Sequence, residues 1–199
     1  AKGCLNTDDV DITIYALPTV AGGPDVTVCE GTMVTLSGSG ATSYNWTGGI
    51  TNAVPFVQNV GQLQYIVTGT DANSCSNSDT VIVHVNPNPV VNAGVDQQGC
   101  DGNMVTLSAT GTSNLYWNNS VINNVPFIQN VGSITYVVTD SLSTGCTSTD
   151  TVVVIVHNNP VISAVGAEIC EGEEVILSGQ GALNYTWTGG VIDNVGFYP

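Results

Sequence analysis

The sequence predicts an all-β protein built from small sandwich domains in tandem. Three observations support this prediction: landmark residues recur about every 71 positions, short strand-like stretches recur with them, and clusters of Gly, Asn, Asp, Ser and Pro separate those stretches. A period this long, without helical patterning, is typical of an array of small domains that contact mainly their neighbours. The repeat therefore sets the domain organisation.

Cysteines, tryptophans and prolines mark the repeat. They form four series: Cys4, Cys75, Cys146; Cys29, Cys100, Cys170; Trp46, Trp117, Trp187; and Pro18, Pro89, Pro160. These series give complete repeats at 18–88 and 89–159, the end of a preceding repeat at 1–17, and the first part of a further repeat at 160–199. We expect the chain to be a piece of a longer array, so leader or anchor signals lie outside what can be read here.

Each repeat contains short stretches with strand character. They include Met33–Leu36, Tyr65–Thr68 and Thr80–Val85, each with a counterpart one repeat later. About seven such strands in ~70 residues, with a Trp near the third, indicate an immunoglobulin-like sandwich. We expect the three tryptophans to anchor the cores, with sugar stacking as the alternative. Short Pro-containing junctions at 87–89 and 158–160 predict tandem immunoglobulin-like β-sandwich repeats in an extended rod.

Composition narrows the functional classes. Lys2 is the only basic residue against 16 acidic ones, which gives a net charge of −15. A chain with almost no cationic surface will not hold nucleic acid or an anionic membrane electrostatically. The longest apolar run, Val152 to Val156, is far shorter than the ~20 residues of a membrane helix. We therefore expect no nucleic-acid partner and no membrane insertion in this stretch. Six repeat-locked cysteines without a CxxC pair indicate disulfides in an oxidising compartment.

Several disulfide pairings respect the period. They are Cys29–Cys75 and Cys100–Cys146 within a repeat; Cys4–Cys29, Cys75–Cys100 and Cys146–Cys170 across half-repeats; and Cys29–Cys146 between neighbouring domains. The turn with Cys29 and the hairpin with Cys75 lie at opposite ends of a sandwich, about 20 Å apart for a six-residue strand, whereas disulfide Cα atoms approach to about 4.4–6.8 Å. Stacked domains would place the first turn of one against the last hairpin of the next. Topology thus favours Cys29–Cys146, while an irregular first strand would leave the within-repeat bond open.

A recurring motif pattern gives the chain a family resemblance. It consists of a Cys-acidic-Gly turn, a V-T-L strand, an aromatic-x-Trp strand, a Y-x-V-T strand, a Cys-containing hairpin and a T-V strand, seen at Cys29–Gly31, Val34–Leu36, Tyr44–Trp46, Tyr65–Thr68, Cys75 and Thr80–Val81. In this pattern the chain resembles the Ig-like/PKD-like repeats of giant Bacteroidota surface adhesins exported by the type 9 secretion system, such as the SprB-type gliding-motility adhesin. The WDFGDG-like strand of PKD repeats is absent, which favours the Ig-like branch. The resemblance implies an extracellular, outer-membrane-anchored location. It also implies O-glycosylation at Asp-[ST]-apolar segments, here Thr80, Ser141 and Thr151.

The sequence offers few candidate residues for catalysis or metal binding. His84 and His157 occupy non-equivalent repeat positions, and no nucleophile–His arrangement recurs, so we predict no catalytic residues and no enzyme. Calcium is the one cofactor considered, through the equivalent positions Glu30, Asp101 and Glu171, together with Asp25 and Asp96 and with Asp8, Asp79 and Asp150. No dense Asp-x-Asp loop supports it, and these acids also suit turns and strand starts.

The sequence therefore predicts a structural role. We expect a stalk segment of a secreted cell-surface adhesin, serving cell adhesion and gliding motility through reach and mechanical strength. Its expected partners are neighbouring repeats, the secretion and surface-anchoring machinery, and a glycan or surface ligand. The alternatives are a carbohydrate-binding repeat array and an S-layer or filament subunit.

Overall fold

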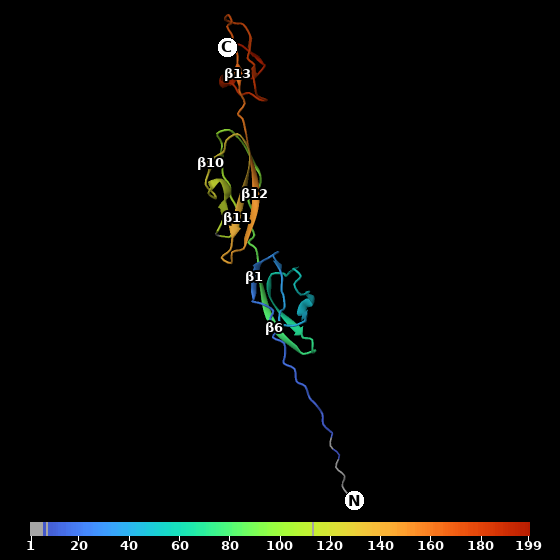
Figure 1. The fold of residues 1–199 in the computed structure, drawn as a ribbon. Coiled ribbons are helices and arrows are strands. Elements are labelled where there is room, and N and C mark those ends of the chain that lie inside the picture. Colours follow the sequence, from blue (N-terminus) through green and yellow to red (C-terminus); the bar gives the residue numbers. More distant parts are fainter. Residues whose placement is uncertain (1–5, 7, 113) are drawn as a thin grey trace. The chain divides into compact units, whose positions relative to one another are not determined.

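The regular structure of the protein is β. The computed structural model describes residues 6, 8–112 and 114–199, and these contain strands and three short 3₁₀ turns but no α-helix (Figure 1). No helix in the described part is long and apolar enough to cross a membrane. The expected all-β class is confirmed.

The first sandwich comprises six strands. They are β1 (Val26–Cys29), β2 (Met33–Val34), β3 (Ser43–Trp46), β4 (Phe56–Val57), β5 (Gly61–Thr70) and β6 (Ser76–Asn86), with the 3₁₀ turn η1 (Thr47–Gly49) after β3. One sheet has the order β1-β6-β5-β3, in which β1 runs parallel to β6 and the other neighbours are antiparallel. The second sheet pairs β2 with β4, and a bridge joins Ala21 to Ser39.

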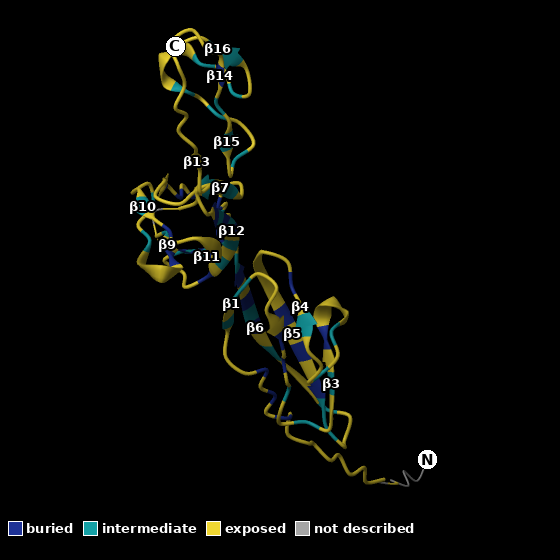
Figure 2. Ribbon diagram, turned by 90° about the horizontal axis from the view of Figure 1, so that it is seen from above, coloured by how far each residue is buried: buried dark blue, intermediate teal, exposed yellow. Residues whose placement is uncertain are grey.

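Alternating side chains explain why these strands pack as a sandwich. Tyr65 and Val67 of β5, like Val81, Val83 and Val85 of β6, are buried while their neighbours face outward (Figure 2). A period of two puts all buried residues on one face of the sheet. The core also includes residues from the opposite side of the sandwich, so both sheets bury one shared cluster: Val20, Val34, Leu36, Trp46, Tyr65, Val67, Val81, Val83 and Val85.

The sheet order identifies the sandwich as immunoglobulin-like. The first segment of the repeat serves both sheets, through the Ala21 bridge on one side and β1 on the other. The third strand carries the buried Trp46, as expected for this fold. The expected strand at 33–36 is regular only over Met33–Val34, and the Leu36 carbonyl accepts a hydrogen bond from the Ala53 amide in the loop between η1 and β4 (2.9 Å).

The second sandwich repeats this plan. Its elements are β7 (Gln97–Cys100), β8 (Met104–Val105), β9 (Tyr116–Trp117), η2 (Asn118–Ser120), β10 (Phe127–Ile128), β11 (Gly132–Ser141) and β12 (Thr147–His157). The sheet order is β7-β12-β11-β9, with β8 paired to β10 and a bridge between Asn92 and Thr110. The chain thus forms tandem immunoglobulin-like sandwiches.

Residues 160–199 form two small sheets. β13 (Ser163–Ala164) pairs with β15 (Gly179–Gln180), and β14 (Val175–Ile176) pairs with β16 (Gly196–Phe197), while η3 (Thr188–Gly190) follows Trp187. Trp187 is half-buried here, whereas Trp46 and Trp117 are 4% and 5% exposed. Residues 8–17, before the first sandwich, adopt no regular strand.

Candidate functional site: the disulfide-linked repeats

A disulfide bond joins the first repeat to the second. Cys29 is the last residue of β1, and Cys146 lies in the hairpin between β11 and β12; their Cα atoms are 5.5 Å apart across 117 residues of sequence. The hairpin residues 139–149 belong to the same compact unit as residues 1–91. This is the pairing that topology favoured, and it excludes the alternatives that would use either cysteine, including Cys29–Cys75 and Cys100–Cys146.

Backbone pairing fixes the Cys29 side of this bond. Cys29 lies opposite Asn86 in the parallel β1–β6 pair, and the next amide, of Glu30, donates to the Asn86 carbonyl (2.8 Å). The side chain of Asn88 then donates through Nδ2 to the Glu30 carbonyl (3.2 Å). The residues just after β6 are therefore bound back to the turn after Cys29.

A tight hairpin fixes the Cys146 side. The Leu142 amide donates to the Cys146 carbonyl (2.9 Å), and the Gly145 amide donates to the Leu142 carbonyl (2.9 Å). Gly145 has φ 86°, a left-handed conformation that glycine adopts without strain. Cys146 is 1% exposed, so the sulfur is shielded from solvent.

The remaining cysteines have no partner among the described residues. Cys75 is half-buried, while Cys100 and Cys170 are exposed; Cys4 lies outside the described residues. Cys75 nevertheless shares the hairpin geometry of Cys146, because the Asp71 amide donates to its carbonyl (3.0 Å). Around Cys100, the Asp101 amide donates to the His157 carbonyl (2.9 Å), and Asn159 Nδ2 donates to the Asp101 carbonyl (3.0 Å). Both halves of the linkage therefore recur with the repeat.

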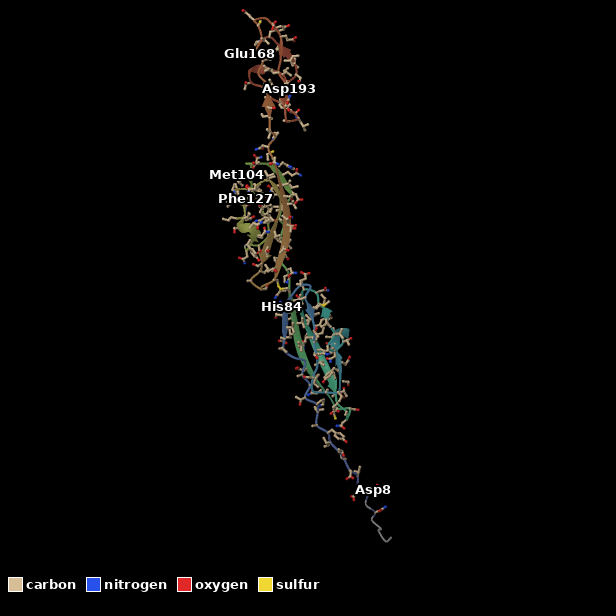
Figure 3. All side chains as sticks on the ribbon, turned by 45° about the horizontal axis from the view of Figure 1, so that its top comes forward. Asp8, His84, Met104, Phe127, Glu168 and Asp193 are labelled. Carbon is tan, nitrogen blue, oxygen red and sulfur yellow. A yellow bond between two sulfur atoms is a disulfide. The ribbon has the colours of Figure 1, made fainter. Side chains whose placement is uncertain are left out.

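Each tryptophan donates to a side chain six residues later. The indole Nε1–H of Trp46 donates to Oδ1 of Asn52 (2.9 Å), and the same oxygen accepts the Gly38 amide (2.7 Å). Asn123 does the same for Trp117 and the Ala109 amide, and Asp193, labelled in Figure 3, for Trp187 and the Gly179 amide. The sequence reading missed this contact, although a Trp-x₅-[Asn/Asp] spacing in every copy could have revealed it.

Four of the acidic residues considered for calcium accept hydrogen bonds from backbone amides. Asp79 Oδ2 accepts the Gly22 amide (2.9 Å) and Asp150 Oδ2 the Ala93 amide (2.8 Å), and these backbone hydrogen bonds lower the pKa of both carboxyl groups. Asp25 and Asp96 accept the amides of Ile82 and Val153 (2.8 Å each).

Glu30, Asp101 and Glu171 are exposed, and Asp8 is exposed before the first sandwich. The described residues contain no group of three or more His, Cys, Asp or Glu side chains that could hold a metal ion. Calcium binding stays a prediction.

One buried carboxylate is specific to the second repeat. Asp140 has no exposed surface, and its Oδ2 accepts the Thr112 amide (2.6 Å) while its other oxygen accepts the Thr112 hydroxyl. Burial raises the pKa of Asp140, but the hydrogen bonds from Thr112 and from the Ser141 amide outweigh it and hold the pKa below its ordinary value. In the first repeat the equivalents of Asp140 and Thr112 are Gly69 and Ala41, and the Tyr44 hydroxyl accepts the Ala41 amide (2.8 Å).

The remaining candidate positions lie on the surface or at strand edges. Thr80 and Thr151 are exposed and Ser141 is half-buried, which leaves O-glycosylation as a prediction. His84, labelled in Figure 3, is exposed on β6, and Nε2 of the exposed His157 ring lies 3.4 Å from Gln98 Oε1. The prediction of no catalytic residues is neither supported nor opposed by these positions.

Comparison with known proteins returns fold-level likeness only. No family model and no curated protein matches the chain. Among solved structures, the chain is similar to extracellular domains 3–5 of Drosophila OTK (15% identity, TM-score 0.35, over 67% of this chain and 59% of that one). It is also similar to an I-band fragment of titin (14%, 0.33, over 84% and 77%) and to the N-terminal eight Ig domains of Down Syndrome Cell Adhesion Molecule (16%, 0.37, over 88% and 34%). At such low TM-scores, the fold assignment rests on the sheet order and not on these likenesses.

Proposed function

We propose that the chain is a load-bearing stalk segment of a secreted cell-surface adhesin. The observation that carries this proposal is the Cys29–Cys146 disulfide, which links consecutive immunoglobulin-like repeats covalently. A disulfide of this kind suits an oxidising, extracellular compartment. The resemblance of the repeat motifs to Bacteroidota surface adhesins supports the finer assignment to adhesion and gliding motility through type 9 secretion, with outer-membrane anchoring.

The disulfide gives the stalk a specific mechanical property. Tension applied at the two chain ends reaches Cys29 and Cys146 and passes through the bond between them. Residues 30–145 then lie inside a covalent loop and do not lengthen, even when both sandwiches lose their hydrogen bonds. Most of the two complete repeats is thereby protected from extension while the bond is intact.

Single-molecule stretching tests this role. An extended chain spans about 3.3–3.6 Å per residue, so the 117-residue separation predicts about 400 Å less contour length in the oxidised protein than in the reduced one. Cys29→Ser should show the longer contour under oxidising conditions. Cys100→Ser, which alters the equivalent but unbonded cysteine, should behave as wild type. Equal contour lengths with and without reductant would reject the load-bearing role.

The buried tryptophans do not favour the carbohydrate-binding alternative. Trp46 and Trp117 offer almost no surface for a sugar ring to stack on, and their indole N–H groups already have partners. No observation in the described residues favours a filament subunit over a stalk. The surface ligand and the anchoring machinery stay predictions.

A further inference from the structure

Each complete repeat contains a long segment without charge. Although the chain has a net charge of −15, residues 31–70 and residues 102–139 contain no Asp, Glu, His, Lys or Arg. They supply β2 to β5 of the first sandwich, and β8 to β10 with most of β11 in the second. The nearest acids before them in the sequence are Glu30 and Asp101, in the turns that precede β2 and β8. Two copies of this acidic chain would therefore repel each other least where these strands meet.

An apolar pair lies on the outward side of the small β2–β4 sheet. Met33 of β2 lies opposite Val57 of β4, and their side chains are 70% and 57% exposed. The neighbouring pair turns inward, with Val34 buried and Phe56 half-buried. Since directly opposite residues of an antiparallel pair have Cβ atoms about 4.5–5.5 Å apart, Met33 and Val57 form one apolar surface.

The second repeat carries the same pair. Met104, labelled in Figure 3, lies opposite Ile128, and their side chains are 71% and 61% exposed. Both pairs lie within complete repeats, so their exposure does not depend on where the chain begins or ends. Single exposed apolar residues are ordinary on a protein surface, whereas a cross-strand pair that recurs with nearly equal exposure is a feature of the repeat. Met33 and Met104 are also the only methionines of the chain, and methionine adapts its shape to many apolar partners.

We propose that the outward faces of the β2–β4 and β8–β10 sheets bind a second copy of this chain. Charge favours this occupant, because the second copy presents a face that is equally free of charge, and no acidic group has to be paired or desolvated in the contact. A basic partner would instead be drawn to the segments that carry the acidic residues. The contact joins like faces, so it closes as a pair and requires no filament.

The two chains are expected to meet through side chains and not by adding a strand. In the part of the chain that the structure describes, β4 pairs only with β2, so its other edge is free. Pro55 directly precedes β4, as Pro126 precedes β10, and proline has no backbone N–H with which to bond a further strand. Face-to-face contact remains, in which sheets pack about 10 Å apart and Met33 meets the apolar pair of the other chain.

The area of the faces sets the strength of the association. A Met or Val side chain brings roughly 60–120 Å² of apolar area to a contact, whereas a stable interface buries about 800 Å² on each partner. A single face is therefore expected to associate weakly, and a chain that engages both of its faces at once associates more tightly. Added salt screens the repulsion between the acidic residues elsewhere on the two chains. Association is thus expected to strengthen with ionic strength and with protein concentration.

Sedimentation velocity of the full 199-residue chain tests the proposal. The exposed thiols are first capped with iodoacetamide, so that disulfide-linked pairs do not count as association. We expect a species of twice the 20.5 kDa mass that grows with protein and salt concentration. The double variant Met33→Asp/Met104→Asp should weaken this association by about tenfold or more, because it buries charges of one sign against each other. Gln62→Asp/Ser133→Asp adds the same charge at exposed positions of β5 and β11 and should weaken it far less.

Cross-linking from the methionines locates the contact. Photomethionine incorporated in place of methionine puts the reactive group only at Met33 and Met104. Chains labelled with light and with heavy nitrogen are mixed in equal amounts before illumination. We expect cross-linked peptides of mixed label that join these positions to β2, β4, β8 or β10 of the other chain.

Three outcomes would overturn the proposal. They are a monomer under every condition, equal effects of the two double variants, and cross-links that stay within one chain or reach only other strands. All four substituted positions are exposed, so neither double variant should lower the melting temperature. The proposal does not depend on the load-bearing role, because stretching of single molecules reports on the bond between Cys29 and Cys146 within one chain.

Discussion

Asp140 does in the second repeat what the hydroxyl of Tyr44 does in the first. Each accepts the backbone amide at the same repeat position, Thr112 in one case and Ala41 in the other. Tyr44 is replaced by Leu115 in the second repeat, which has no hydroxyl, while Gly69 is replaced by Asp140. The third copy returns to the first arrangement, with the Ala182 amide donating to the Tyr185 hydroxyl (2.6 Å).

This exchange predicts that residues taken from the first repeat can restore the stability lost when Asp140 is removed. Asp140→Gly should lower the melting temperature, because it leaves the Thr112 amide and hydroxyl without acceptors. Adding Leu115→Tyr, Thr112→Ala and Ala109→Gly recreates the residue set of the first repeat and should recover most of the loss, as measured by calorimetry. Ala109→Gly is needed because a Cβ at the equivalent Gly38 would lie 2.5 Å from Tyr44 Cδ1. A quadruple variant no more stable than Asp140→Gly would show that the two acceptors are not interchangeable.

Acid should destabilise both sandwiches through three carboxylates. The folded pKa values of Asp79, Asp140 and Asp150 lie below the ordinary value. A lowered folded pKa contributes stability at pH values above the unfolded pKa of about 3.9, and this contribution is lost as the pH falls through the folded pKa. Urea unfolding should therefore show a constant contribution near neutrality and a decline below about pH 4. Asp150→Asn should be less stable than wild type at pH 7 and lose less on acidification; an unchanged acid dependence would contradict this assignment.

Removing the Asn52 side-chain oxygen, which accepts the Trp46 indole N–H, should cost much stability, whereas replacing the amide by a carboxylate should cost little. Asn52→Ala leaves the Trp46 indole N–H and the Gly38 amide unpaired, at an expected cost of about 2–4 kcal/mol. Asn52→Asp keeps the oxygen, as Asp193 does in the third copy, and should cost less than about 1 kcal/mol. Denaturant titration followed by circular dichroism measures both. Equal losses would mean that this oxygen is not what the site requires.

Replacing the buried glutamine of a sandwich by glutamate should destabilise the fold. Gln58 is 5% exposed, and its Nε2 donates to the carbonyls of Gly61 and Val83 (3.3 and 3.2 Å). Gln58→Glu removes both donors and buries a charge facing two carbonyl oxygens, so we expect a loss of about 3 kcal/mol or more at pH 7. Gln62→Glu adds the same charge at an exposed position of β5 and should change stability by less than about 0.5 kcal/mol. Thermal unfolding measures both variants. Comparable losses of stability would show that the hydrogen bonds donated by Gln58 do not stabilise the sandwich.

The sequence was sufficient for features that depend on period and alternation. The 71-residue spacing identified the repeats, and the apolar alternation of Thr80–Val85 identified β6, since one face of a strand must be buried. Topology favoured Cys29–Cys146 because the two turns that carry these cysteines lie at ends of their domains. What could not be predicted was local hydrogen bonding. Gln58 and Asn88 look like ordinary surface amides in a chain rich in Asn and Gln, and only the structure shows which carbonyl each one meets.

The paired replacement of Tyr44 and Gly69 by Leu115 and Asp140 bears on the exchange of sequence between repeats. An exchange of sequence between two repeats that falls between these two positions would create hybrid repeats. A hybrid with Leu115 and Gly69 would have no acceptor for the amide at the Ala41/Thr112 position, and a hybrid with Tyr44 and Asp140 would have two acceptors for it. Exchange of a whole repeat keeps each amide with its own acceptor, whereas an exchange inside a repeat leaves one peptide N–H without an acceptor or with two.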